Sequence, residues 1–277
     1  MLSIISADER IKSYGTAIKG ILLGKVKIGK TSQLWTLSPK TTLFVDIEAG
    51  GLSVQGWKGD SLEPKTWEEC KDIACFVGGP NVGLRPEQCY STEHYNHVMT
   101  AGLSMNKYDT IFIDSISVAS RLCLQYCKGQ PEAISEKSGK ADNRGAYGLL
   151  AKEMIQWLTQ LQHAKGKNIW FVGILDEKMD DYNRKFFAPQ IEGASTALQM
   201  PGIVDEVIVM TDLPGDDGIP YRAFVCQTPN MWNFPCGDRS GKLDLIEPPS
   251  LGLLMQKIKD GKRSNPSQFD YKLNKGE

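Results

Sequence analysis

The chain has 277 residues, 41% of them hydrophobic and 23% charged, which is typical of a globular protein with one large domain or two small ones. A formal net charge of −1 excludes a protein that binds nucleic acid through its overall charge, so such binding would need a local patch. No apolar run approaches the roughly 18 residues of a membrane span, and the N-terminal residues lack a signal-peptide pattern. We therefore expect a cytoplasmic protein without membrane contact.

The first half of the chain alternates predicted helices and strands. Apolar periodicity and turn residues place their boundaries. The predicted helices cover residues 4–18, 31–37, 92–105 and 116–127. The predicted strands cover residues 20–23, 41–48, 72–79 and 108–115.

The second half begins with a polar stretch, 128–144, that we predict to be a loop. An amphipathic helix is predicted next, because apolar residues recur every three or four positions: Tyr147, Leu150, Met154, Trp157 and Leu161. We expect this helix to end at Gly166. Further strands are predicted at 168–175 and 204–210, near 221–227 and before Pro235, and a last helix lies at 248–261.

Alternating strands and helices predict an α/β fold with a mostly parallel central sheet flanked by helices. The late hairpins add antiparallel strands at one edge. We expect one domain over residues 1–258 and a flexible polar and basic tail over 259–277.

The seven cysteines are an odd number in a chain without a secretory signal, which predicts reduced thiols. One cluster invites comparison with a zinc site: Cys70, Cys75, Cys89, His94 and His97. Its spacings are irregular and contain no C-x-x-C pair, so buried thiols and surface histidines are the favoured interpretation.

The segment "GKVKIGKT" has the spacing of a phosphate-binding loop between a strand and a helix. Lys30 is predicted to reach the β- and γ-phosphates, and the Thr31 hydroxyl to bind Mg²⁺. The alternative is a glycine turn with an exposed lysine. The predicted nucleotide-binding residues are Gly24, Lys25, Val26, Lys27, Ile28, Gly29, Lys30, Thr31 and Ser32.

The loop's interior is unusual, because Val26 and Ile28 resist positive φ angles and two lysines add charge. This raises a question about nucleotide affinity more than about the existence of a site.

Two acidic residues follow predicted buried strands. Asp114 ends one strand and is a candidate Mg²⁺ ligand, because ligands bind at the carboxyl edge of parallel strands. Its alternative role is a helix N-cap. Glu48 lies at the end of another predicted strand and could orient the attacking water as a general base. Its alternative is a solvated loop acid.

Gly24–Thr31, "DIE" (46–48) and "YDTIFIDS" (108–115), in this order, resemble the RecA-like P-loop ATPase core. Longer stretches, including "DIEAGGLSVQGWKGDS", "RGAYGLLAKEMIQWLTQLQH" and "PQIEGASTALQMPGIVDEV", resemble the phage-type RecA-like ATP-binding proteins of the single-strand annealing group. The resemblance covers about residues 6–258. It implies a RecA-like fold, a catalytic role for Glu48 and a magnesium role for Asp114.

The group usually carries K-x-R before S-G in its late hairpin region, where this chain reads "GDRSG" (237–241) and lacks the lysine. In ring-forming relatives such basic residues reach a neighbouring subunit's γ-phosphate. The resemblance therefore implies that Arg239 is catalytic in a homo-oligomer. A plain surface arginine is the alternative.

RecA-like proteins bind single-stranded DNA with two loops, which correspond here to 128–144 and 176–196. The second segment interleaves Lys178, Arg184 and Lys185 with Tyr182, Phe186 and Phe187, a pattern suited to base stacking and phosphate pairing. Its four acids, Asp176, Glu177, Asp180 and Asp181, favour a solvated loop instead. Asp176 or Glu177 could also sense the γ-phosphate.

Together these features predict an ATP- and Mg²⁺-dependent ATPase that acts on single-stranded DNA in phage-type recombination or annealing. Lys30, Glu48 and Arg239 are its predicted catalytic residues, and Thr31 and Asp114 its predicted metal ligands. A single-strand binding protein is a further candidate partner, and a bacterial host cytoplasm the expected location. The alternatives are a nucleotide-gated DNA-binding or assembly protein with negligible turnover, and a P-loop kinase.

Overall fold

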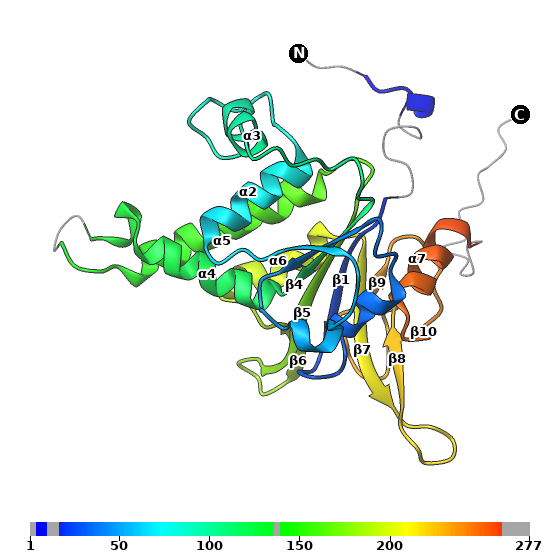
Figure 1. Ribbon diagram of the computed structural model, residues 1–277. Coiled ribbons are helices and arrows are strands. Elements are labelled where there is room, and N and C mark those ends of the chain that lie inside the picture. The colour runs from blue at the N-terminus through cyan, green and yellow to red at the C-terminus, as the bar shows by residue number, and fades with distance from the viewer. Residues whose placement is uncertain (1–3, 10–16, 136–138, 262–277) are drawn as a thin grey trace, which may run out of the picture.

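A computed structural model describes residues 4–9, 17–135 and 139–261 as one sheet flanked by helices (Figure 1). The strand order is β10-β8-β7-β1-β5-β4-β2-β3, with β6 paired to β5 and β9 paired to β7. The strands are β1 (Lys19–Gly24), β2 (Thr42–Asp46), β3 (Asp60–Leu62), β4 (Thr110–Asp114), β5 (Asn168–Met179), β6 (Lys185–Pro189), β7 (Glu206–Leu213), β8 (Tyr221–Val225), β9 (Gly237–Asp238) and β10 (Ile246–Glu247).

The strands from β3 to β7 along this order are parallel, whereas β6, β8, β9 and β10 join by antiparallel pairing. The predicted fold class is therefore confirmed. One detail differs: β6 pairs with the outer half of β5 in the middle of the sheet, so the antiparallel strands do not all lie at one edge.

Helices cover both faces of the sheet, as the near-continuous apolar strands require. The helices are η1 (Thr31–Thr36), η2 (Gly51–Val54), α2 (Trp67–Gly78), α3 (Thr92–Met99), α4 (Ile116–Lys128), η3 (Pro131–Ala133), α5 (Asn143–Gln162), α6 (Ala194–Ile203) and α7 (Leu251–Asp260), the η elements being 3₁₀ helices.

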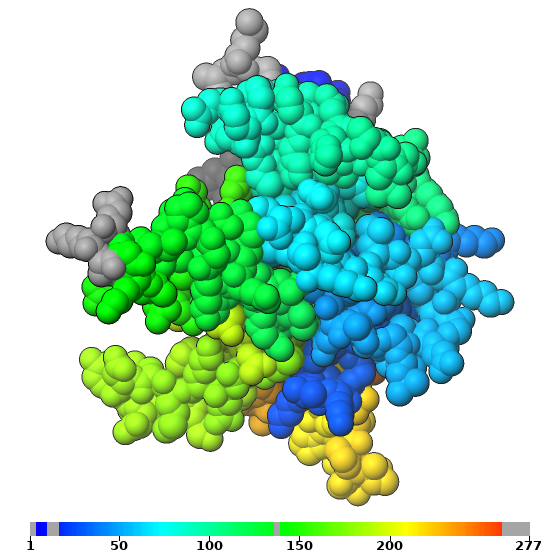
Figure 2. Space-filling view, turned by 60° about the vertical axis from the view of Figure 1, so that its left-hand side comes forward, coloured from blue at the N-terminus to red at the C-terminus, as the bar shows by residue number. Residues whose placement is uncertain are grey.

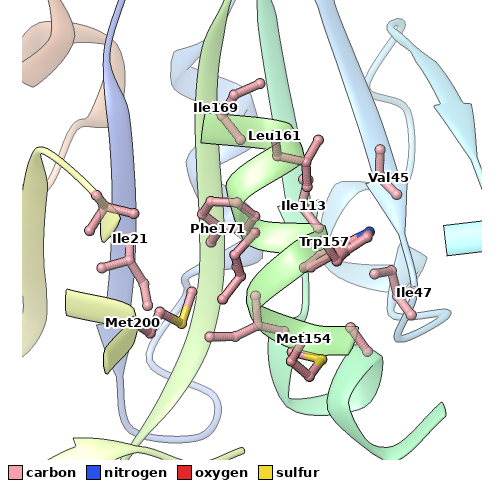
Figure 3. Close-up of a cluster of buried hydrophobic side chains, with 14 of the residues drawn as sticks. Ile21, Val45, Ile47, Ile113, Met154, Trp157, Leu161, Ile169, Phe171 and Met200 are labelled. Carbon is pink, nitrogen blue, oxygen red and sulfur yellow. The ribbon is translucent and has the colours of Figure 1, made fainter. Parts of the chain in front are cut away.

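The larger core lies between the sheet and the layer of α2, α4, α5 and α6. Figure 3 shows Trp157 and Met154 of α5 against Ile113 and Phe171 of the sheet. The rings of Trp157 and Phe171 lie 5.8 Å apart between centroids. The periodic face predicted for this helix is thus its buried face, apart from Tyr147, which is 43% exposed.

The opposite face of the sheet is covered by η1 and α7. A second core cluster joins Leu22, Phe112 and Trp170 of the sheet to Leu34 and Leu254. The loop after β1 connects the sheet to η1 in this thinner layer, and its residues 25–27 are exposed.

The strand predicted at 72–79 is wrong, because residues 72–78 belong to α2 and Gly79 is its C-cap. Thr66 accepts a hydrogen bond from the Glu69 amide, and the Glu69 side chain accepts one from the Thr66 amide, which closes a capping box. Trp67, Cys70 and Ala74 then bury one helical face. The apolar run at 72–79 resembles a strand because it is short. The element β3, a largely exposed strand of three residues, was not predicted from the sequence.

Other element boundaries in the structure also differ from the predicted ones. Residues 7–9 are helical, but 10–16 lie outside the described residues, so the predicted helix 4–18 is only partly covered. The helix predicted at 92–105 ends at Met99. The strand predicted before Pro235 lies after it, as β9. Helix α7 continues to Asp260, two residues past the expected domain end, and most of the predicted tail, 262–277, is not described.

All seven cysteines are free thiols, and within the described ranges no group of three or more His, Cys, Asp or Glu side chains could hold a metal ion. The described helices include none with the length and apolar character needed to cross a bilayer.

Candidate functional site

The loop after β1 has the backbone that a phosphate-binding loop needs. Positive φ angles fall on Lys27 (61°) and Gly29 (95°), so neither Val26 nor Ile28 takes the conformation that β-branched residues resist. Ile28 instead turns inward and is buried in the core. A Cβ at Gly24 would lie 2.6 Å from the Met210 carbonyl oxygen, so only glycine fits at the start of the loop.

Lys30 lies at the end of this loop and is 9% exposed, which contradicts the alternative of a solvent-exposed lysine. Its Nζ donates to the carbonyl oxygens of Gly24 (3.0 Å) and Lys25 (2.8 Å), so the ammonium closes the loop on itself. Burial lowers the pKa of Lys30, and the negative charges of Asp114 and Glu48 oppose this shift. Both carboxylates are therefore close enough for their charges to act on the ammonium.

The element after the loop differs from the prediction. Residues 31–36 form the 3₁₀ helix η1, which is only six residues long, and Lys30 makes no side-chain cap. Such a short helix adds little macrodipole. Attraction for phosphate must come from Lys30, the loop amides and nearby cations.

Thr31 and Asp114 meet directly. Asp114 ends β4, and its Oδ2 accepts a hydrogen bond from Thr31 Oγ1 at 2.5 Å. Burial, together with the charges of Glu48 and Asp46, raises the pKa of Asp114 to about 6, although the Thr31 hydrogen bond and Lys30 act in the opposite direction. The N-cap alternative is excluded, because Ser115 caps α4 and bonds the Val118 amide.

Glu48 follows β2 at the same sheet edge. Parallel pairing sets Asp46 beside Asp114, and the amides of Ile47 and Glu48 donate to the Asp114 carbonyl oxygen at 2.7 and 3.2 Å. The Glu48 side chain is exposed, whereas the Asp46 carboxylate is buried and accepts from the Gly50 amide. Of the two acids, Glu48 is the one that can act on water.

A loop, one ammonium, one hydroxyl and two carboxylates thus converge at the carboxyl edge of β1, β4 and β2. A sequence model described as an AAA domain matches residues 16–240. The chain belongs to this family. The match confirms the predicted P-loop ATPase class; it does not test the narrower phage-type group, which stays a prediction.

Solved structures resemble the AAA domain only distantly. The ATPase of a type III secretion system of pathogenic bacteria is 12% identical with a TM-score of 0.37, and the match covers 70% of this chain and 51% of that one. The flagellar accessory protein FlaH of Methanocaldococcus jannaschii is 12% identical (TM-score 0.34; 85% and 89% covered). The pCW3 conjugation coupling protein TcpA is 15% identical (TM-score 0.35; 70% and 49% covered).

The AAA domain thus spans about half the length of the secretion ATPase and of TcpA. No curated protein sequence matches the chain. These structural likenesses assign neither a substrate nor a partner.

Arg239 lies apart from this site. Its Nη1 pairs with Asp205 Oδ1 at 3.0 Å and its Nη2 donates to the Gly202 carbonyl oxygen. Asp205 precedes β7, and β7 runs parallel to β1, so Arg239 is at the opposite edge of the sheet from the loop. It does not reach the nucleotide site of its own chain. A role in a neighbouring subunit's site stays a prediction.

The two segments predicted to bind DNA project on the same side of the molecule (Figure 2). Residues 176–192 are largely the β5–β6 hairpin rather than an irregular loop, and α6 begins at Ala194. Segment 128–144 contains η3 and the start of α5, with 136–138 not described.

Two cations of the β5–β6 hairpin have acidic partners. Arg184 pairs with Asp180 at 2.8 Å and Lys185 with Glu177 at 2.5 Å. Tyr182 is 79% exposed, and the Arg184 guanidinium lies 5.2 Å from its ring centroid. The acids noted in the sequence thus neutralise these two cations.

One residue beside the loop was missed. A Cβ built on Gly29 would lie 3.4 Å from Arg222 Nη1, so this guanidinium lies close to the phosphate loop. No sequence motif marks Arg222, because strand pairing between β7 and β8 brings it there.

Proposed function

We propose that this AAA domain is a Mg²⁺-dependent ATPase that acts on single-stranded DNA in phage-type recombination or annealing. The observation that carries the proposal is the convergence of Lys30, Thr31, Asp114 and Glu48 around one phosphate-loop backbone. A plain glycine turn requires none of these contacts.

Lys30 binds the phosphates in this proposal. Its ammonium is bonded to two loop carbonyl oxygens, and phosphate oxygens are stronger acceptors for a charged donor. On nucleotide binding, Lys30 exchanges at least one carbonyl for a phosphate oxygen. The loop amides supply further donors without moving a side chain.

Thr31 and Asp114 fit Mg²⁺, which prefers hydroxyl and carboxylate oxygens. Their oxygens already lie 2.5 Å apart beside the loop. Bound Mg²⁺ would neutralise part of the phosphate charge. The ionised form of Asp114 serves this role, and the positive charge of Lys30 favours that form.

Glu48 orients the attacking water. Its carboxylate is exposed, and its backbone is fixed to the Asp114 carbonyl oxygen. An exposed carboxylate on a fixed backbone can accept a proton from a water molecule as the water attacks.

The DNA-binding part of the proposal rests on the family resemblance and on an exposed aromatic beside a cation. Tyr182 offers a stacking surface for a base, and Arg184 can leave Asp180 for a backbone phosphate. Because such exposed ion pairs are weak, their exchange for phosphate contacts costs little.

A phosphate-release assay with and without single-stranded DNA tests the proposal. We expect Mg²⁺-dependent release that DNA increases, and a smaller increase in a Tyr182→Ala variant. A rate of phosphate release that is the same with and without DNA would contradict the DNA-binding role but not the ATPase activity.

A second candidate is a nucleotide-gated DNA-binding or assembly protein with negligible turnover. The six-residue 3₁₀ helix after the loop favours it, because a weak dipole stabilises transition-state charge poorly. ATP binding by calorimetry without measurable phosphate release would support this function instead.

We also propose that the chain forms a homo-oligomer in which Arg239 reaches the nucleotide site of a neighbouring subunit. The turnover per chain should then rise with protein concentration, and Arg239→Ala should remove that rise without changing ATP affinity. A turnover per chain that is independent of concentration in both proteins would contradict this role.

A further inference from the structure

Strand pairing brings one arginine to the phosphate loop from the side opposite the acids. Met210 of β7 pairs with Gly24, where the loop begins, and Asp212 pairs with Arg222 of β8. Arg222 therefore lies just beyond the end of β1. A Cβ built on Gly29 would lie 3.4 Å from its Nη1, so the guanidinium lies close to the loop.

The guanidinium has one ion-pair partner. Arg222 Nε pairs with Asp212 Oδ1 at 3.0 Å, and both side chains are about half exposed. This bond uses one of the five N–H donors of arginine and leaves both Nη groups for another acceptor. A planar donor fork on a tether is suited to phosphate oxygens.

The strand order shows which charged residues approach the loop from each side. In the order β8-β7-β1-β5-β4-β2, Arg222 comes from one side of β1, while Asp114 and Glu48 come from the other. The carboxylates mark the end where the terminal phosphate reacts. The phosphates nearer the nucleoside then lie toward β7 and β8.

We infer that Arg222 binds the diphosphate part of the nucleotide in the same chain. The inference rests on the proposed nucleotide site and deepens it. Because ADP and ATP share this diphosphate, Arg222 stabilises both complexes about equally. It also replaces part of the attraction that the short helix η1 does not provide.

Calorimetric titration of the full chain with ADP and with ATPγS tests this inference. In Arg222→Ala, the Kd for each nucleotide should rise by about tenfold, the effect expected of one partly exposed charge-assisted pair. Arg222→Lys should recover part of the loss, since it keeps the charge but not the fork. The kcat at saturating ATP should stay within about twofold of wild type.

Lys107→Ala is the matched control. Lys107 forms an equally exposed ion pair with Asp60 at the opposite sheet edge, so its removal tests a simple loss of charge. It should leave both affinities unchanged. Melting curves of every variant verify folding, and Arg222→Gln carries the same expectation if the alanine variant unfolds.

Three results would overturn the inference: unchanged affinities in Arg222→Ala, a loss confined to ATPγS, or a fall in kcat at unchanged Kd. The second and third would place Arg222 at the terminal phosphate. A wild-type chain that binds neither nucleotide would instead overturn the proposed function itself.

Discussion

Individual side chains in this site are explained by burial and by their neighbours' charges. Lys30 is buried among carbonyl oxygens, and Asp114 is 3% exposed beside Glu48 and Lys30. Burial lowers the pKa of Lys30 and raises the pKa of Asp114 to about 6, and the charge of each group opposes the shift of the other.

Replacing Lys30 by alanine tests its role directly. We expect ATP affinity to fall by about tenfold or more, because a buried ammonium is lost where phosphate charge gathers. Calorimetry measures the affinity and phosphate release the turnover. If both are unchanged in Lys30→Ala, the site is assigned wrongly.

Glu48→Gln separates binding from chemistry. The amide keeps the size of the side chain but cannot take a proton, so turnover should fall by about 10²–10⁴-fold while ATP affinity is retained. Single-turnover phosphate release measures the step. Glu93→Gln, which changes an exposed acid of α3, is the control and should retain wild-type turnover. Full activity in Glu48→Gln would exclude the carboxylate as the base.

At the scale of elements, residues at the helix ends determined two structures that hydrophobic periodicity did not predict. Residues 72–79 have the length and apolar character of a strand, but the capping box at Thr66 starts a helix that continues through them. In the same way, η1 stops after six residues, with Leu37 extended and Pro39 following. Local features at helix ends thus set the start of α2 on one face of the sheet and the length of η1 on the other.

Thr66→Ala tests the start of α2. Loss of its hydrogen bond to the Glu69 amide should lower the free energy of unfolding by about 1 kcal/mol. Urea denaturation measures the change, and Ser61→Ala in the half-exposed β3 serves as the control. An unchanged stability would mean that α2 does not depend on this cap.

Across the whole molecule, one sheet separates two charged edges. The carboxyl edge carries the phosphate loop and its acids, whereas the opposite edge carries Asp205, Glu206, Asp238 and Arg239. Glu206 is 2% exposed, and its Oε2 has no hydrogen-bond partner among the described residues. Burial and the adjacent Asp238 raise the pKa of Glu206 to about 9.

This edge predicts how stability depends on pH. The pKa of Glu206 is about 4.5 unperturbed and about 9 folded, so the folded state binds one more proton between these values. The free energy of unfolding should therefore fall as pH rises from 5.5 to 8, by at most about 1.4 kcal/mol per unit. Glu206→Gln removes that dependence, and urea denaturation across this range measures it. Parallel pH curves for both proteins would contradict the prediction.

The sequence by itself determined the alternation of strands and helices, the phosphate loop and the acids at two strand ends, because buried parallel strands and phosphate loops have local patterns. Spacing also sufficed to predict that Lys30, Thr31, Asp114 and Glu48 share one edge. The helix through residues 72–78 depends on the capping box of Thr66 and Glu69, a local signal that hydrophobic periodicity alone does not detect. Only the tertiary structure decided the edge on which Arg239 lies and the approach of Arg222 to Gly29. These two outcomes depend on pairing between strands that are distant in the sequence.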